Sequence, residues 1–245
     1  MKNILTSIST LPNSDMNKKE SKNELKNIKK ELFELQNKFF ADGRFGLLVI
    51  LQGMDTSGKD GVIRHVFTSM NPMGVKVTSF KKPSGEELNH DFLWRIYPYF
   101  PAKGIIRIFN RSYYEDILVP MVSKTLELDG IHHRYQIINM LEEHLKRNNI
   151  HILKFFLNIS KDKQKEKIDE RKTKPHKKWK YEVNDEETRK DWDEYLDAYN
   201  MVMTNCNQEP WHIIASDKRW NRNYEVAQIL LNHFKSLELK YPNQL

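Results

Sequence analysis

Apolar residues occur along the chain in two kinds of pattern, short continuous runs and stripes with helical spacing. Short apolar stretches predict strands, and the unbroken run Phe45–Leu51 predicts a strand covered on both faces, as in a parallel sheet. The predicted strands are Phe45–Leu51, Val75–Phe80, Gly104–Phe109, Ile150–Ile159 and Trp211–Ala215. The remaining stretches predict helices at Lys18–Phe40, Gly61–Met70, Gly85–Tyr97, Tyr113–Val122, Ile131–Arg147, Lys161–Arg171, Asp185–Asn205 and Asn221–Leu237. This alternation predicts a doubly wound α/β domain with a five-stranded, mostly parallel sheet.

The first 44 residues are expected to form an extension of this domain. Met1–Asn17 is polar and is predicted to be a mobile start. Lys18–Phe40 carries an apolar stripe that includes Ile28 and Leu32, and we expect it to pack on the domain core or on another subunit. A membrane-surface helix is the weaker interpretation, because acids are mixed through its polar face. The expected division is residues 1–44 for the extension and 45–245 for the α/β domain.

A glycine-bounded loop follows the first predicted strand directly. It reads Gly53-Met54-Asp55-Thr56-Ser57-Gly58-Lys59-Asp60 and leads into a predicted helix. Strand, glycine-bounded loop, lysine and helix is the order found in phosphate-binding P-loops. Inward N–H groups and the positive end of the helix can bind an anion there, and Lys59 can reach a terminal phosphate. The stretch predicts a three-layer P-loop kinase fold; a glycine-rich turn is the alternative interpretation.

Two acids distinguish this loop from the usual pattern. Asp60 occupies the position of the Ser or Thr whose hydroxyl normally binds Mg²⁺, and Asp55 lies inside the loop. A carboxylate beside phosphate is favourable when a metal ion lies between them. Asp55 is therefore the predicted ligand of Mg²⁺, with Mn²⁺ as a second option.

Polar residues also follow the third predicted strand, at the rim where doubly wound sheets bind ligands. Asn110 stands where P-loop enzymes usually have a metal-binding Asp. Help for Asp55 is then expected from nearby acids, namely Asp60, Glu115 or Asp116. Arg111 can clamp phosphate through two parallel hydrogen bonds. A plain strand-end turn is the alternative for Asn110–Ser112.

Further basic residues lie along the same rim. Lys81 and Lys82 follow the second strand, and Arg95 comes later in the chain. They are candidates for the phosphate of a second substrate, although each alone also fits an exposed surface charge. We expect Trp94 and Tyr97 to be core residues rather than base-stacking ones.

A basic segment follows the predicted helix Lys161–Arg171. Between Arg171 and Lys180 there are six Lys or Arg residues and no acid. Such a block repels itself unless a polyanion organises it. Its place after a helix predicts a lid over phosphates, at about residues 171–184; an exposed loop is the alternative.

Composition limits the compartment and the partners. The chain has 245 residues and one cysteine, Cys206, which excludes an internal disulfide and favours a reducing cytoplasm. No apolar run is long enough to predict a membrane span. The net charge of +7 suggests a polyanionic partner. Nucleic acid is not expected, because no basic strand interleaved with aromatics and no recognition-helix pattern occurs.

The chain resembles the polyphosphate kinase 2 family over roughly Phe39–Leu231. The resemblance rests on Gly53–Lys59 with its internal acid and on further stretches in the same order, namely Val77–Ser84, Asn89–Arg95, Asn110–Asp116, and Lys178–Lys180 before Trp192–Tyr195. Asn110–Asp116 is most similar to the class III branch, whose members phosphorylate nucleoside mono- and diphosphates.

This resemblance implies Mg²⁺-dependent phosphoryl transfer between inorganic polyphosphate and AMP or ADP, or GMP or GDP, with ADP and ATP as products. Asp55 would hold metal, and Lys59 and Arg111 would stabilise the transferring group. Nucleotide-binding positions would be Lys81, Lys82, Arg95 and Asn110. Polyphosphate would be held by Arg64, Arg171, Lys177, Lys178 and Lys180. The family commonly forms dimers or tetramers.

Two alternatives remain at this stage. An ATP-dependent nucleoside or nucleotide kinase could have the same fold, because a fold does not determine the phosphate donor. A nucleic-acid-binding protein that uses the basic face is the less favoured alternative.

Overall fold

The protein is built around one parallel sheet. The computed structural model describes residues 4–13, 17–180 and 189–242. In that part of the chain, the sheet has the strand order β2-β3-β1-β4-β5, with every neighbouring pair parallel. Its strands are β1 (Gly46–Gln52), β2 (Val75–Ser79), β3 (Ile106–Asn110), β4 (Ile150–Asn158) and β5 (Trp211–Ala215). The five predicted strands are confirmed, and the sheet is parallel throughout rather than mostly so.

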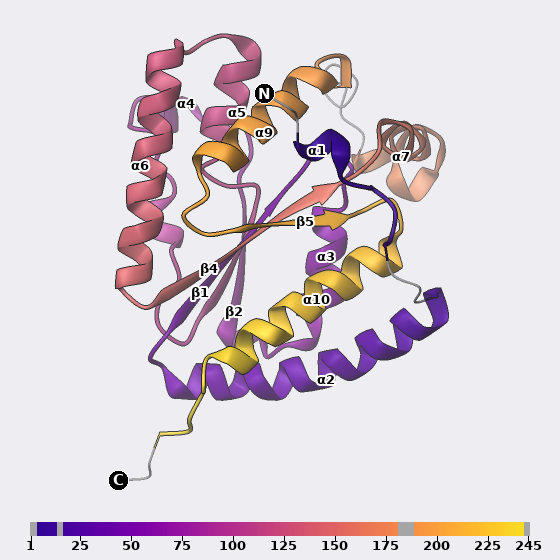
Figure 1. Ribbon diagram of the computed structural model, residues 1–245, viewed down its shortest axis with the longest axis vertical. Coiled ribbons are helices and arrows are strands. Elements are labelled where there is room, and N and C mark those ends of the chain that lie inside the picture. The colour runs from indigo at the N-terminus through magenta and orange to yellow at the C-terminus, as the bar shows by residue number, and fades with distance from the viewer. Residues whose placement is uncertain (1–3, 14–16, 181–188, 243–245) are drawn as a thin grey trace.

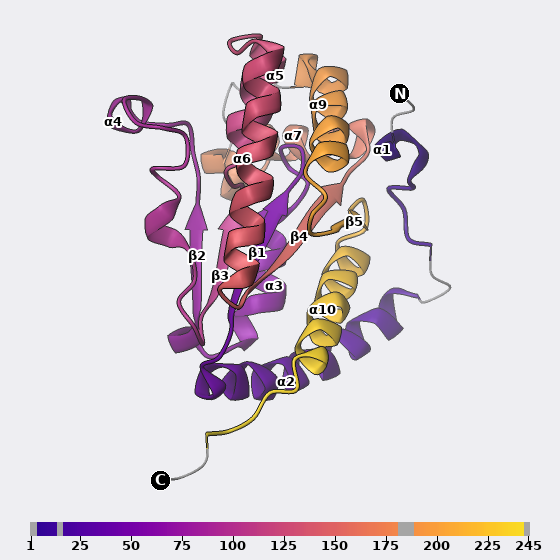
Figure 2. The same ribbon diagram turned by 60° about the vertical axis from the view of Figure 1, so that its left-hand side comes forward.

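Helices cover both faces of the sheet. The α-helices are α1 (Ile4–Ser7), α2 (Lys18–Asp42), α3 (Lys59–Val66), α4 (Gly85–Leu88), α5 (Glu115–Ser123), α6 (Leu128–Arg147), α7 (Lys161–Thr173), α9 (Trp192–Asn205) and α10 (Arg219–Ser236). Short 3-10 turns are η1 (Phe67–Ser69), η2 (Pro72–Gly74), η3 (Tyr97–Tyr99) and η4 (Pro175–Lys180). Helices α5, α6 and α9 lie on one side of the sheet, and α2, α3 and α10 lie on the other (Figures 1 and 2). The predicted three-layer fold is confirmed.

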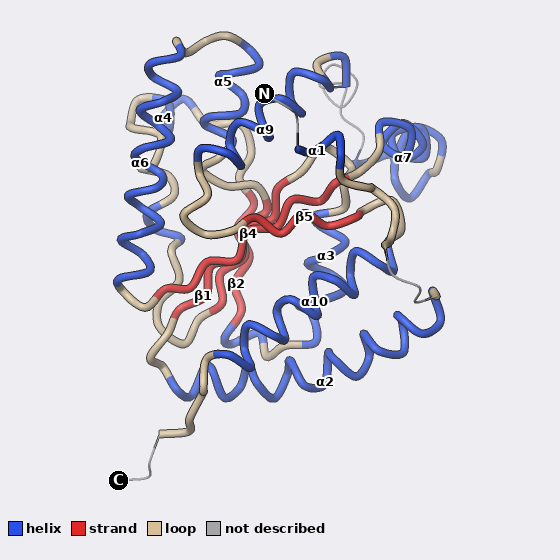
Figure 3. The backbone as a smooth tube through the Cα atoms, viewed as in Figure 1, coloured by secondary structure: helices blue, strands red, loops and turns tan. Residues whose placement is uncertain are grey.

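Strand β1 is the middle strand of the sheet, whose strands lie between the helices in Figure 3. All of its residues are buried. Leu48 and Ile50 pack into the core on the α5/α6/α9 side, whereas Leu47, Val49 and Leu51 pack into the core on the α2/α3/α10 side. This strand is therefore fixed from both faces. It leads into the glycine-bounded loop Gly53–Lys59, here called the phosphate loop, and gives that loop a rigid base.

Helix α2 belongs to the second of these cores. It begins with a capping box formed by Asn17 and Glu20. Ile28, Leu32 and Phe39 are buried in the same cluster as residues of α10. The rings of Phe39 and Phe234 pack edge to face, with their centroids 5.4 Å apart. The predicted core packing of the apolar stripe is confirmed. No helix in the described ranges combines the length and the apolar character needed to cross a bilayer.

The predicted mobile start is wrong for residues 4–13, which are docked on the domain. Leu5 is 2% exposed and joins the core on the α9 side. Asn158 Nδ2 donates to Ile8 O at 3.1 Å, and Asp217 N donates to Thr10 O at 3.2 Å. One buried leucine and a few backbone bonds hold a segment whose polar composition suggested no packing.

The predicted helix Gly85–Tyr97 is correct only in its first turn. Ser84 and Glu87 form the expected capping box, but α4 ends at Leu88. Asp91 Oδ1 accepts a hydrogen bond from Leu93 N at 2.9 Å, and such local side-chain bonds compete with helix formation. The predicted helix Asp185–Asn205 starts among residues 181–188, which lie outside the described residues, as do residues 181–184 of the predicted lid.

Candidate active site

The phosphate loop joins β1 to α3 at the carboxyl edge of the sheet. Gly53, Thr56 and Gly58 have φ angles of 140°, 65° and 106°. A Cβ on Gly53 would lie 2.8 Å from Leu157 O, so the close approach to β4 requires glycine. The Thr56 and Ser57 hydroxyls are buried and have no hydrogen-bond partner among the described residues. Such buried polar groups would be satisfied by a bound phosphate.

Lys59 is the first residue of α3 and is buried beneath this loop. Its Nζ donates to Gly53 O at 2.6 Å and to Met54 O at 3.2 Å. Burial, followed by the positive charge of Arg111, lowers the pKa of Lys59 to about 8. The amine is thus held at the base of the loop, mostly protonated at neutral pH.

Arg111 and Asp55 form the ion pair at the mouth of the loop. Arg111 has a φ of 63° directly after β3, a conformation that costs energy in a non-glycine residue and is often found at functional sites. One guanidinium nitrogen lies 2.6 Å from Asp55 Oδ1 and another 3.9 Å from Glu115 Oε2. Burial acts to raise the pKa of Asp55, but Arg111 and then Lys59 outweigh it and the pKa is lowered. Asp55 is therefore an ionised carboxylate.

Asn110 and Glu115 extend this cluster. Asn110 Nδ2 donates to Asp60 Oδ1 at 3.0 Å, which joins the end of β3 to the first turn of α3. Glu115 Oε1 accepts from Gln52 Nε2 at 2.9 Å. The structure therefore brings together the phosphate loop, Asn110, Arg111 and Glu115, as the rim argument predicted.

The carboxylates of this cluster can be tested against the needs of a metal ion. Among the described residues, no three His, Cys, Asp or Glu side chains gather into a metal-binding group. Mg²⁺ usually takes one or two protein carboxylates and completes its shell with water and substrate phosphates. Asp55 fits that requirement because it is ionised and Arg111 engages only its Oδ1. Glu115, on the same guanidinium, is the second candidate.

Asp116, unlike Asp55 and Glu115, pairs with Arg95 and not with Arg111. Its Oδ2 lies 3.2 Å from a guanidinium nitrogen of Arg95, whose other nitrogen donates to Lys81 O at 2.8 Å. Arg95 is 6% exposed, whereas Lys81 and Lys82 are exposed. Arg95 and Lys81, both predicted to bind the phosphate of a second substrate, are therefore in contact. The hydrogen bonds of Arg95 connect the end of β2 to the start of α5.

Trp94 and Tyr97 are not core residues, and that prediction is wrong. They are 41% and 57% exposed. Because the helix stops at Leu88, the segment after it turns these rings outward. Trp94 instead stacks on His90, with ring centroids 4.0 Å apart and an interplanar angle of 12°.

The basic residues predicted for the lid lie in the last turn of α7 and in η4. Lys177 Nζ lies 2.7 Å from Glu170 Oε2, and Lys178 is exposed. Arg171 at the end of α7 is close enough for its charge to help lower the pKa of Asp55, after burial and the effects of Arg111 and Lys59. Lys180 is the last residue of η4, and Arg64 is exposed on α3. Among the residues predicted for the lid, Arg171 is thus the one whose charge acts on Asp55.

Several residues that support the loop were missed from the sequence. Tyr199 Oη on α9 accepts from Gly53 N at 3.3 Å. Ser216 Oγ donates to Ser57 O at 2.6 Å, and Arg222 on α10 donates to the same carbonyl at 3.2 Å. Each is distant in sequence from residues 53–59. The only sequence signal was their place after a strand or on a helix that the fold brings to the rim.

A buried ion pair anchors the two tyrosines that follow Arg111 in the chain. Lys154 Nζ on β4 lies 2.8 Å from Glu142 Oε2 on α6, and both side chains are fully buried. The Tyr113 and Tyr114 hydroxyls donate to Glu142 Oε1 at 2.8 and 2.5 Å. The two tyrosines follow Arg111 closely in the chain, so this network fixes the turn that carries it.

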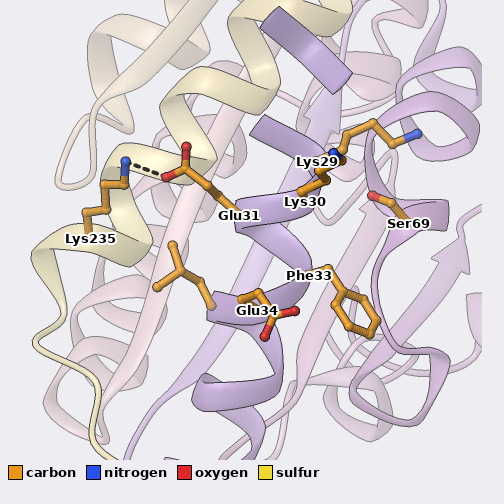
Figure 4. Close-up of a pocket in the computed structure, with 8 residues that line it drawn as sticks. Lys29, Lys30, Glu31, Phe33, Glu34, Ser69 and Lys235 are labelled. Carbon is orange, nitrogen blue, oxygen red and sulfur yellow. Dashed lines mark ion pairs between the residues drawn. The ribbon is translucent and has the colours of Figure 1, made fainter. Parts of the chain in front are cut away.

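A separate groove lies between α2 and α10, away from these residues (Figure 4). It is lined by Lys29, Lys30, Glu31, Phe33, Glu34, Leu35, Ser69 and Lys235. Lys235 Nζ pairs with Glu31 Oε2 at 2.7 Å. None of the predicted site residues lines this groove, so the candidate site remains the rim around the phosphate loop.

The chain is similar to known proteins over most of its length. Residues 15–242 match the family model described as polyphosphate kinase 2. The chain belongs to the polyphosphate kinase 2 family. The crystal structure of Polyphosphate Kinase 2 from Arthrobacter aurescens TC1 superposes with a TM-score of 0.95 at 39% sequence identity, covering 98% of this chain and 88% of that chain.

Curated relatives in this family have related names. The AMP/ADP-polyphosphate phosphotransferase of Meiothermus ruber is 42% identical over 217 residues, which are 88% of this chain and 81% of that protein. The ADP-polyphosphate phosphotransferase of Rhodopseudomonas palustris is 41% identical over 225 residues, covering 86% of this chain and 78% of that protein. Both support the resemblance that the motifs indicated.

Proposed function

We propose that this protein transfers a phosphoryl group between inorganic polyphosphate and AMP or ADP, forming ADP and ATP, with GMP and GDP as further acceptors. The observation that carries the proposal is a phosphate loop with its own carboxylate, Asp55, paired with Arg111 at 2.6 Å. A bare carboxylate would repel phosphate, whereas a carboxylate with a metal ion would attract it. The names of the relatives from Meiothermus ruber and Rhodopseudomonas palustris support this substrate class.

The chain's own residues supply position and charge. Phosphoryl transfer needs little covalent help from the protein, and an acceptor phosphate is already an anion. Lys59 approaches the loop from α3, and Arg111 approaches it from the end of β3. The pairing with Asp55 holds Arg111 in place before substrate arrives, so little reorganisation is needed at the moment of transfer.

Mg²⁺ is the proposed metal ion, and Mn²⁺ could replace it. Asp55 would hold the ion, with Glu115 as the second protein ligand. When bound, the ion would offset negative charge on the phosphate oxygens. Asn110 would contribute indirectly, because its amide holds Asp60 at 3.0 Å beside the loop.

Two groups of basic residues lie on opposite sides of β1. Lys81, Lys82 and Arg95 follow β2 on one side of β1, and α7 follows β4 on the other side. We assign the nucleotide to the β2 side. To bind a phosphate, Arg95 would have to give up its hydrogen bond to Asp116 or to the Lys81 carbonyl.

Polyphosphate is assigned to the α7 side, where Arg171 already acts on Asp55. Its remaining proposed contacts are Arg64, Lys177, Lys178 and Lys180. A homo-oligomer, either a dimer or a tetramer, and a cytoplasmic setting complete the proposal. The buried free thiol of Cys206 supports a reducing environment.

The test is nucleotide turnover by the purified protein with polyphosphate and Mg²⁺, with AMP and ADP supplied separately. We expect ATP from ADP, and ADP followed by ATP from AMP. Lys59→Met and Asp55→Asn proteins, checked for an unchanged fold by circular dichroism, serve as controls and should lose most turnover. A nucleotide product that forms only when ATP replaces polyphosphate as donor would contradict the proposal.

A further inference from the structure

Arg222 on α10 is a buried cation that the proposed mechanism does not use. Its side chain is 5% exposed. One terminal nitrogen donates to Ser57 O at 3.2 Å, and the other terminal nitrogen and Nε donate to Asn223 Oδ1 at 3.1 and 3.3 Å. The guanidinium therefore donates to one oxygen of the phosphate loop and to one oxygen of its neighbour on α10, and both oxygens are neutral.

Two glycines make room for this guanidinium. A Cβ on Gly58 would lie 1.9 Å from one terminal nitrogen of Arg222, and a Cβ on Gly61 would lie 2.7 Å from the other. Gly58 is the N-cap of α3 and Gly61 lies in its first turn. The guanidinium thus packs directly on the N-terminal turn of the P-loop helix.

This is an unfavourable place for a positive charge in the unliganded protein. The N-terminus of a helix carries partial positive charge and repels cations. No Asp or Glu in the described ranges lies within ion-pair distance of Arg222. Arg219, one turn earlier on α10, adds a further positive charge, and burial removes the solvation of the guanidinium.

An anion in the phosphate loop would offset the unfavourable electrostatics of this charge. We propose that Arg222 is a positioning residue for phosphate binding, which holds the Ser57 carbonyl and supplies a buried positive charge that only a bound phosphate balances. The inference rests on the proposed function for the identity of that phosphate, a polyphosphate terminus. It predicts that Arg222 costs stability in the free protein and contributes affinity in the complex.

The test compares Arg222→Met with Arg222→Lys and with Arg219→Met. Arg222→Met keeps similar volume and removes the charge, and Ser57 O retains its hydrogen bond from Ser216 Oγ at 2.6 Å. Arg222→Lys keeps the charge. Arg219→Met removes the same charge from an exposed position of the same helix and is the matched control, because solvent screens exposed charges.

The measurements are calorimetric affinity for tripolyphosphate, KM and kcat with polyphosphate and ADP, and the melting temperature. For Arg222→Met we expect tripolyphosphate affinity to fall about tenfold or more, KM for polyphosphate to rise similarly, and KM for ADP to change less. The melting temperature should stay the same or rise, because a buried charge without a carboxylate is removed. Arg222→Lys should retain most of the affinity, and Arg219→Met should lose less than about threefold.

A purely structural Arg222 would give the opposite pattern. A lower melting temperature with unchanged tripolyphosphate affinity in folded Arg222→Met, or an equal affinity loss in Arg219→Met, would overturn the inference. If Arg222→Met does not fold, the prediction of retained stability is overturned as well. Failure of the wild-type protein to bind tripolyphosphate would instead contradict the proposed function, so the two failures are distinguishable.

Discussion

The lowered pKa of Lys59 predicts a specific loss of activity at alkaline pH. Lys59 is 8% exposed, and its ammonium group donates to two loop carbonyls. Burial and the charge of Arg111 lower its pKa from 10.5 to about 8. The perturbation is therefore a rise of pH through this value, which removes the charge that the proposed function assigns to phosphate binding.

The size of the effect follows from this pKa. A change from 10.5 to about 8 corresponds to about 3 kcal/mol in favour of the neutral amine. About nine-tenths of Lys59 is protonated at about pH 7 and about one-tenth at about pH 9. Since kcat/KM reports groups of the free enzyme, kcat/KM for polyphosphate should fall about ninefold between these values. A bound phosphate favours the ammonium form, so kcat should fall only at higher pH.

The assay measures kcat and KM for polyphosphate at saturating ADP from about pH 6.5 to about pH 9.5. Lys59→Arg is the control, because a guanidinium stays protonated throughout this range. Its absolute rate is expected to be lower, but its profile should lack the alkaline fall. A wild-type profile that stays flat to about pH 9.5, or an identical fall in Lys59→Arg, would refute the reasoning.

The same group affects stability with a defined sign. Between about pH 8 and about pH 10.5 the unfolded chain holds a proton on Lys59 that the folded chain has lost. The free energy of unfolding should therefore rise with pH in this window as far as Lys59 contributes. The cost of burying the charged amine is fully present below about pH 8, so Lys59→Met should be at least as stable as wild type at neutral pH.

Three further predictions concern other parts of the site. Asp55→Asn should lower kcat at least about a hundredfold and weaken the Mg²⁺ dependence of the residual rate, since it removes the ionised ligand; an unchanged Mg²⁺ titration would exclude Asp55 as a ligand. The double variant Lys177→Ala, Lys178→Ala should raise KM for polyphosphate more than KM for ADP. Equal changes in the two KM values would argue against polyphosphate binding by these lysines. Glu142→Gln should cost about 3–5 kcal/mol of stability, because it leaves Lys154 buried without its counter-charge; chemical denaturation measures this, and a cost below about 1 kcal/mol would disprove that the ion pair matters.

The parts of the molecule that depend on local pattern were predictable. Buried strands with continuous apolar runs stood out, and the order strand, loop, lysine and helix placed Gly53–Lys59 correctly. The parallel sheet then required Asn110 and Arg111 to lie beside that loop, and they do. These results follow from short-range sequence signals combined with one topological rule.

Contacts between distant segments were not predictable. Arg222 and Tyr199 reach the loop from α10 and α9, and nothing in their local sequence distinguishes them from surface or core residues. Helix α4 ends at Leu88, a local bond from Leu93 N to Asp91 follows it, and Trp94 beyond it is exposed. Docking of residues 4–13 depended on Leu5 finding a core site. For Arg222, Tyr199 and Leu5 the outcome was decided by tertiary contacts that the local sequence pattern does not encode.

The most direct test of the central claim follows the phosphoryl group itself. The protein would be incubated with uniformly ³²P-labelled polyphosphate, unlabelled ADP and Mg²⁺, and the products separated by chromatography. Label in the γ-phosphate of ATP, formed by the wild-type protein and lost in Asp55→Asn, is the predicted result. Label that appears only in free orthophosphate, or ATP formed without label, would contradict direct transfer from polyphosphate to the nucleotide.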